Sequence, residues 1–297
     1  VLYTLFHAGV DPKTPLFQDL LHKILTTELE TTYTVALQAM VLQEMDPIKY
    51  RWRLAQCAQF LVDNQCQNGQ WPYGEQTKIP KDVPTFQKPD REDVETVGKK
   101  QKRKKKPKRI VIRPQRSGID KGDNSNSQYA ILGLRACMEA NIWPTRDVLS
   151  LSLDWWRQAQ QNDGGWAYHG LGSSSYGSMT AGAVGSVVIL QHYLGRQWKR
   201  DIGARKGVQW IGKSFSVTDN PGKTTSWHYY YLYALERTGV LTGLQKFGKS
   251  DWYKEGANYL LDAQGSDGSW KSLRNTCFAI LFLKRATPPL KKVATGR

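Results

Sequence analysis

The chain has 297 residues, of which 40% are hydrophobic and 23% charged, a balance typical of a globular protein. No apolar run approaches the roughly 20 residues needed to cross a bilayer, so we expect a soluble protein with no transmembrane segment. The sequence opens inside an apparent helix at Val1, which suggests a truncated N-terminus. The sequence therefore leaves open both the presence of a signal peptide and the cellular compartment.

The net charge of +16 is concentrated in one segment. Nine Lys and Arg residues fall between positions 99 and 109, within a proline-rich stretch over 72–122. We expect 72–122 to be a disordered or extended basic insertion within a single domain that spans 1–297. Its most basic part predicts an anionic partner or a membrane surface: Lys102, Arg103, Lys104, Lys105 and Lys106. No aromatic residue lies among these charges, so there is no specific nucleic-acid signature.

Two kinds of helix are predicted from the apolar periodicity, in alternation along the chain. Helices that are apolar nearly all round are predicted at 2–7 (the end of one), 32–43, 125–140, 177–194, 226–237 and 275–286. Five more polar helices lie between them, among them 50–64, 148–159 and one that begins near Trp252. The apolar helices are expected to be buried and the polar ones exposed.

A short motif, Q-x-x-[N/D]-G-x-W, occurs three times, each time after a polar helix. Its fixed residues are Gln65, Gly69 and Trp71 in the first copy, Gln160, Gly164 and Trp166 in the second, and Gln264, Gly268 and Trp270 in the third. We expect each Gly to end the preceding helix in a left-handed cap. We expect each Trp to fold back and bury its ring over the helix hairpin.

Hairpins that pair one buried helix with one exposed helix either extend as a solenoid or close into a ring. Six buried helices favour closure around a central cavity. The predicted fold is therefore all-α, as an α/α toroid of about six helix hairpins with buried inner helices and exposed outer helices.

The repeated motif resembles the QW motif of squalene and oxidosqualene cyclases, and the same hairpin repeat builds the β subunits of protein prenyltransferases. The segment from Asp251 to Trp270, with the apolar helix after it, resembles bacterial prenyltransferase and squalene-cyclase repeat proteins in particular. This resemblance to the terpenoid-cyclase and protein-prenyltransferase superfamily covers nearly the whole chain outside 72–122. It implies the toroid and a cavity for an isoprenoid or other hydrophobic ligand, but a shared fold does not carry function with it.

The catalytic residues of those families have no counterparts here. Cyclases use an Asp-rich motif that opens a buried helix, whereas the matching helix start at 125–130 contains no carboxylate, and Asp123 is expected only to cap it. His228 falls on the position of the zinc-binding His of prenyltransferases, but the matching Asp-x-Cys is absent from 175–180. One His does not make a zinc site. We therefore predict no metal and no cofactor, and His228 as either a polar cavity residue or a core histidine.

Three functional hypotheses stay open: a ligand-binding protein without the standard catalysis, an isoprenoid transferase or terpene cyclase with unconventional residues, and a protein-interaction scaffold. In the first, the ligand is hydrophobic, with an anionic head at the rim where the buried helices begin. The basic insertion is expected on the same rim. The predicted ligand-binding residues are His228, Trp227, Tyr176, Asn126, Thr276 and Tyr33.

Overall fold

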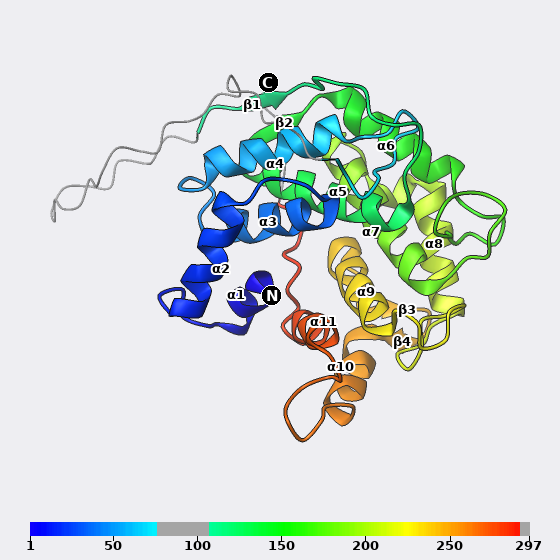
Figure 1. Cartoon of the computed structure of the whole chain (residues 1–297). Coiled ribbons are helices and arrows are strands. Elements are labelled where there is room, and N and C mark those ends of the chain that lie inside the picture. The colour runs from blue at the N-terminus through cyan, green and yellow to red at the C-terminus, as the bar shows by residue number, and fades with distance from the viewer. Residues whose placement is uncertain (76–106, 292–297) are drawn as a thin grey trace, which may run out of the picture.

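The computed structural model describes residues 1–75 and 107–291, and the regular secondary structure of these parts is almost entirely helical (Figure 1). Six helices occupy the positions predicted as apolar: α1 (Leu2–Ala8), α3 (Thr32–Met45), α5 (Asn124–Glu139), α7 (Gly177–Tyr193), α9 (His228–Thr242) and α11 (Leu273–Leu283). Five alternate with them: α2 (Pro15–Thr26), α4 (Arg51–Asp63), α6 (Arg146–Gln158), α8 (Ile202–Lys213) and α10 (Trp252–Asp262). The all-α prediction is confirmed. The described residues also contain one 3₁₀ turn (Trp198–Arg200) and four short strands: β1 (Ile110–Ile112), β2 (Ile142–Pro144), β3 (Lys246–Phe247) and β4 (Ser250–Asp251).

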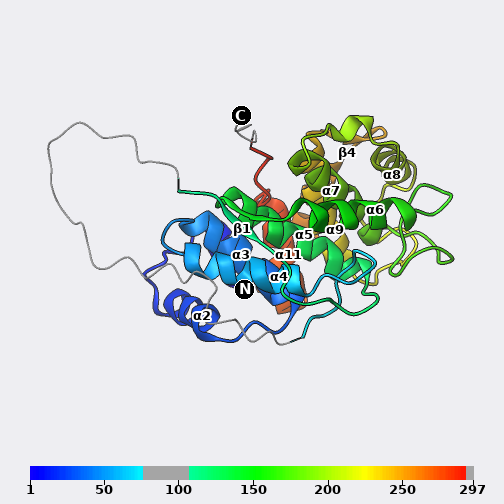
Figure 2. The same ribbon diagram turned by 90° about the horizontal axis from the view of Figure 1, so that it is seen from above.

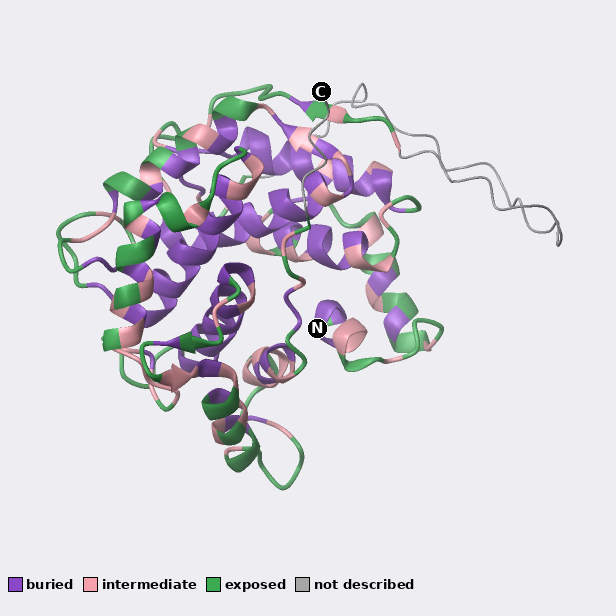
Figure 3. Cartoon of the chain, turned by 180° about the vertical axis from the view of Figure 1, so that it is seen from behind, coloured by how far each residue is buried: buried purple, intermediate pink, exposed green. Residues whose placement is uncertain are grey.

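Burial follows the predicted division for most helices, but the prediction was wrong for α4, which was expected to be exposed. This helix buries eleven of its thirteen residues because α3, α5, β1 and β2 all pack against it. In α5, α7 and α9 all but one or two residues of each helix are buried, whereas α8 buries only three of its twelve residues. Figure 3 shows the same division, with exposed residues on the outward sides of the outer helices. The helix at the chain end differs: α11 buries only Ala279, Leu281 and Phe282, so it is half-exposed despite its apolar sequence.

The inner helices contact one another in cyclic order along the chain. Each of α1, α3, α5, α7 and α9 touches the next in the series, and α11 touches α1. The outer helices lie against this set from outside, α4 against α3 and α5, α8 against α7, and α10 against α9 and α11 (Figures 1 and 2).

The three copies of the repeated motif adopt one geometry. Each indole ring is buried, and its Nε1 donates to a carbonyl ten residues earlier on the preceding outer helix: Trp71 to Leu61, Trp166 to Trp156, and Trp270 to Leu260, at 2.6–2.8 Å. Each Trp also donates its backbone N–H to a hydroxyl of the next inner helix, on Ser127, Thr180 and Thr276 respectively. The motif therefore ties the end of an outer helix to the start of the next inner one.

The predicted role of the motif glycines was wrong. The preceding helices end at Asp63, Gln158 and Asp262, and their caps are Asn64, Ala159 and Ala263, none of which is left-handed. The left-handed residues are Gly69, Gly164 and Gly268, with φ of 91°, 89° and 78°, in the turn that follows. Their positive φ serves the tight turn that directs the Trp back over the hairpin.

The described parts of the basic insertion lie along the outside of the molecule. Strand β1 pairs in parallel with β2, and Asn141 donates from its side chain to the Pro107 carbonyl. Further along, Asp63 accepts from the Gln115 backbone N–H. Residues 107–122 are thus extended and held at a few points, but most of them are exposed. Lys102, Arg103, Lys104, Lys105 and Lys106 lie outside the described residues.

The segment after α11 runs inward to the C-terminal ends of the inner helices. Glu236 of α9 accepts from the Thr287 hydroxyl at 2.7 Å and from its backbone N–H at 3.2 Å. Arg135 of α5 donates to the Pro288 carbonyl, and Tyr3 of α1 donates to the Ala286 carbonyl at 3.2 Å. This segment therefore links α1, α5 and α9 at one end of the inner set.

The motif geometry predicts a stability cost for Thr180→Val. The substitution conserves shape but leaves the buried Trp166 N–H without its acceptor, which now lies at 3.0 Å. An unsatisfied buried donor costs about 1–3 kcal/mol, so urea denaturation should show a loss of about that size. Thr180→Ser, which keeps the hydroxyl, is the control; equal stability of the two variants would contradict the interpretation.

Glu236 predicts a pH dependence of stability. Burial raises its pKa from the usual 4.5 to about 7, and the Thr287 hydrogen bonds lower it by less. Between these values the folded chain holds a proton that the unfolded chain has released, so stability falls as the pH rises from 4.5 to about 7. At 1.36 kcal/mol per pKa unit, the loss is at most about 3 kcal/mol.

Glu236→Gln retains the hydrogen-bonding shape and should flatten this part of the stability–pH profile, measured by denaturation across the range. Glu255→Gln removes a charge from the exposed side of α10 and serves as the control. An unchanged slope in Glu236→Gln would rule out Glu236 as its source.

Candidate functional site

An extended cavity lies where the inner helices begin, and we refer to it as the large cavity. Its volume is about 500 Å³, within the ~300–1,000 Å³ usual for small-molecule sites. Most of its lining is aromatic, from Tyr33, Tyr73, Tyr168, Tyr176, Trp227, Tyr230 and Phe278. The other lining residues are Ser125, Ser178, Met179 and Arg274. Tyr73 and Trp227 are 61% and 60% exposed, so they lie at its mouth. No carboxylate or thiol belongs to this lining.

Three hydroxyl groups meet on the wall of this cavity. The Tyr33 hydroxyl is hydrogen-bonded to Ser125 and, at 3.1 Å, to the Tyr230 hydroxyl, which lies 3.2 Å from Ser125 Oγ. These residues come from the first turns of α3, α5 and α9. Because α5 and α9 are separated by α7 along the series, the hydroxyls connect opposite sides of the inner set. Burial raises the pKa of Tyr33 and of Tyr230, so both phenols stay protonated.

Behind these hydroxyls lies a buried arginine. The guanidinium of Arg237 lies 4.3 Å from the ring centroid of Tyr233 and 5.2 Å from that of Tyr129, and it donates to Gln128 at 2.8 Å. The centroid of the Tyr129 ring in turn lies 4.4 Å from that of the Tyr33 ring. The stacked side chains fill the space between the inner helices below the cavity.

A second pocket of about 250 Å³ adjoins the first and is positively charged. The two share Trp227, Tyr230, Arg274 and Phe278 as lining residues. Lys271 also lines the second pocket, and no carboxylate does. His228 contributes no charge near neutral pH, because burial lowers its pKa. A ligand that spans both pockets would thus meet aromatic rings in one and two cations in the other.

Two non-glycine residues with left-handed backbones border this second pocket. Trp227 has φ of 58° and directly precedes α9, and Lys271 has φ of 64° just before α11. Left-handed conformations cost a non-glycine residue roughly 1–2 kcal/mol. Such strain concentrates at functional sites, where neighbouring structure holds it in place.

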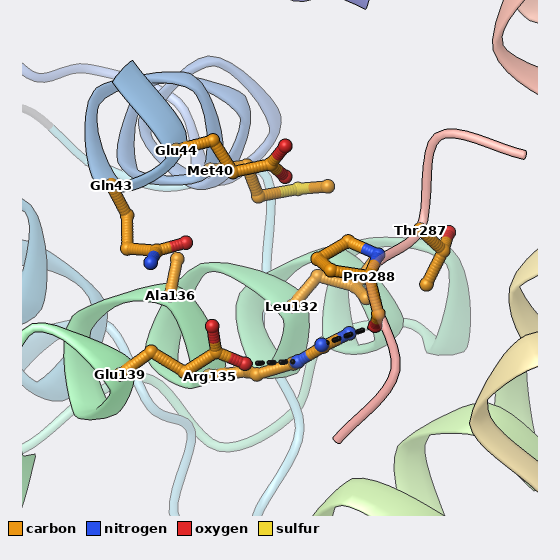
Figure 4. Close-up of a pocket in the computed structure, with 9 residues that line it drawn as sticks. All are labelled: Met40, Gln43, Glu44, Leu132, Arg135, Ala136, Glu139, Thr287 and Pro288. Carbon is orange, nitrogen blue, oxygen red and sulfur yellow. Dashed lines mark hydrogen bonds and ion pairs between the residues drawn. The ribbon is translucent and has the colours of Figure 1, made fainter. Parts of the chain in front are cut away.

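The opposite end of the inner helices is closed. A small space of about 20 Å³ lies there. It is lined by side chains of α3 and α5 and by Thr287 and Pro288 (Figure 4). Arg135 bridges Glu139, at 3.0 Å, and the Pro288 carbonyl. Glu44 binds Tyr3 at 2.9 Å and His7 at 3.2 Å. Arg135, Glu139 and Glu44 thus have partners within the chain, and the space of about 20 Å³ leaves little room for a ligand at this end.

The six predicted ligand-binding residues divide into three groups. Tyr33, Tyr176 and Trp227 line the large cavity, and His228 lines the second pocket. Asn126 and Thr276 line neither pocket. The Asn126 side chain instead binds Asp123, which caps α5 as predicted, and Thr276 accepts the Trp270 backbone N–H.

His228 has a structural partner. Its Nε2 is 2.8 Å from the Val217 carbonyl, which fixes the N–H on that nitrogen, and its ring lies 5.1 Å from Tyr259. Among the described residues no group of three or more His, Cys, Asp or Glu side chains is placed to hold a metal ion. The arrangement therefore gives no support to zinc at His228.

Sequence reasoning missed several lining residues, notably Ser125, Tyr230, Lys271 and Arg274. A signal was present for Ser125 and Tyr230, because each lies in the first turn of a predicted buried helix, as the correctly predicted Tyr33 does. That position faces the centre when helices run the same way. Lys271 and Arg274 were missed because anion binding was predicted at the much denser run of Lys and Arg at 99–109.

A search of protein families found none that matches the chain, and a search of curated proteins found no similar sequence. Within 1–75 and 107–291, no helix combines the length and the hydropathy required to cross a membrane.

The strained backbone predicts that Lys271→Gly is more stable than Lys271→Ala. Both substitutions remove the same charged side chain, but only glycine adopts φ of 64° without a steric cost. After the larger chain entropy of unfolded glycine is subtracted, we expect a difference of about 0.5–1 kcal/mol. Thermal denaturation of the two variants measures it, and a more stable alanine variant would show that the left-handed backbone carries no strain.

Proposed function

We propose that the chain binds a hydrophobic molecule with an anionic head, with the apolar part in the aromatic cavity and the head beside Lys271 and Arg274. The observation that carries the proposal is the continuity of a mainly aromatic pocket with a pocket lined by Lys271 and Arg274, through four shared residues that include Arg274. An isoprenoid diphosphate fits this description.

The charges favour an anion over a cation. Arg274 lines both pockets and stacks its guanidinium 4.7 Å from the Trp227 ring, which holds it at the mouth. Lys223 lies 5.0 Å from the Tyr176 ring on the same mouth. These cations surround a mouth that also includes the start of α9, whose helix dipole favours negative charge.

We further propose that the chain is an α/α toroid of the terpenoid-cyclase and prenyltransferase type. The cyclic order of inner-helix contacts and the repeated Trp geometry support this relationship. Neither pocket contains a carboxylate or a cysteine, which favours binding without the standard catalysis of those families.

Calorimetric titration with farnesyl diphosphate, with and without zinc, tests the proposal. We expect micromolar binding that is indifferent to zinc. Replacing both Lys271 and Arg274 by Ala should weaken it roughly 10- to 100-fold, because a hydrogen bond to a charged group contributes about 1.5–3 kcal/mol.

Two controls locate the effect. The double substitution Lys199→Ala and Arg200→Ala removes two exposed charges outside both pockets and should leave the affinity unchanged. Replacing Lys102–Lys106 by Ser tests the basic run, which we expect to matter less than Lys271 and Arg274. Absence of binding by the unaltered chain would contradict the proposed function, and binding that strengthens with zinc would favour a transferase.

A further inference from the structure

The three hydroxyls on the cavity wall form a closed triangle. Tyr33, Ser125 and Tyr230 are each within hydrogen-bond distance of the other two, and each lines the large cavity. A hydroxyl donates one hydrogen bond and accepts two. Around a closed triangle each group donates once and accepts once, so each oxygen keeps one free acceptor site, and turning one O–H outward supplies a donor.

The triangle is a buried polar group in a mostly aromatic wall. Ser125 is 9% and Tyr230 7% exposed, so the hydroxyls are removed from bulk water. A buried hydroxyl costs free energy unless it is hydrogen-bonded, whereas an apolar side chain of similar shape fills the same space without that requirement. The wall close by is apolar, with the Phe278 ring 5.7 Å from Tyr230. The polar group is therefore local and specific within an aromatic surface.

Two members of the triangle and Lys271 lie in different pockets. Tyr33 and Ser125 line only the large cavity and Lys271 lines only the second pocket, whereas Tyr230 and Arg274 line both. The rings of Trp227 and Phe278 also line both pockets. A molecule that reaches from Lys271 to Tyr33 and Ser125 would thus pass these rings and meet a cation at one end and hydroxyls at the other.

We propose that the ligand carries an oxygen function, a hydroxyl or a carbonyl, at the end remote from its anionic head, and that the triangle of Tyr33, Ser125 and Tyr230 binds it. This inference rests on the proposed function, since the anionic head sets the orientation of the ligand. It narrows the ligand class from hydrophobic anions in general to those with a polar far end.

The test compares two series of probes, the n-alkyl phosphates from hexyl to dodecyl and the same compounds with a terminal hydroxyl. Binding is followed by titration with the full chain. A terminal hydroxyl normally weakens binding in an apolar cavity because it must leave water. We expect instead, at the chain length that reaches the triangle, about 3- to 10-fold tighter binding of the hydroxyl compound, the gain of one hydrogen bond.

Tyr230→Phe and Ser125→Ala identify the source of the gain. In variants that still bind the plain alkyl phosphate, each substitution should abolish the preference for the terminal hydroxyl. Because each variant is judged by a ratio of two ligands, loss of folding cannot imitate the result. Tyr176→Phe, which alters a cavity tyrosine outside the triangle, should keep the preference.

Two results overturn the inference. If alkyl phosphates bind but the hydroxyl compounds bind more weakly at every length, the triangle does not recognise an oxygen, while the proposed function stands. If no alkyl phosphate binds at any length, the anionic-head proposal and this inference fail together.

Discussion

Helices that are apolar on every side must be covered on every side, and this constraint shapes the whole molecule. A helix such as α7, with fifteen of seventeen residues buried, needs neighbours on both flanks and an outer helix behind it. The repeated Trp supplies the connection, since it bonds backward to the outer helix and forward to the next inner one. The energetic consequence is that no hairpin is complete alone, so stability accumulates between neighbours.

The same constraint explains why the two ends of the inner set differ. Where the inner helices begin, large aromatic side chains from their first turns line a cavity instead of filling it. Where they end, Arg135, Glu139 and the segment around Thr287 fill the space with paired polar groups. Of the described pockets, the two large ones thus lie at one end of the inner set, the end toward which the helix dipoles direct their positive poles.

Helix positions were predictable because periodicity and the thrice-repeated motif are local signals, and the alternation of inner and outer helices followed from them. The site was predictable only in part. Tyr33, Tyr176 and Trp227 follow from their places at helix starts, whereas the pairing of Lys271 with the Trp227 region depends on the turn before α11. Asn126 and Thr276 also lie near the starts of predicted buried helices, but neither lines a described pocket. The Asn126 side chain donates to Asp123, the cap of α5, and the Thr276 hydroxyl accepts from the Trp270 backbone N–H. The inward run of 286–291 has no periodic signal, since it depends on buried partners such as Glu236.

The contact between α1 and α11 joins segments at opposite ends of the described chain, and no covalent connection reinforces it. The Tyr3 hydroxyl reaches the Ala286 carbonyl across 283 residues of sequence. Bringing together two segments so far apart in the sequence has an entropic cost, which the contacts between α1 and α11 must offset. Because α11 also contributes Arg274 and Phe278 to the lining of the cavity, any separation of α11 from α1 would displace two lining residues and change the shape of that cavity.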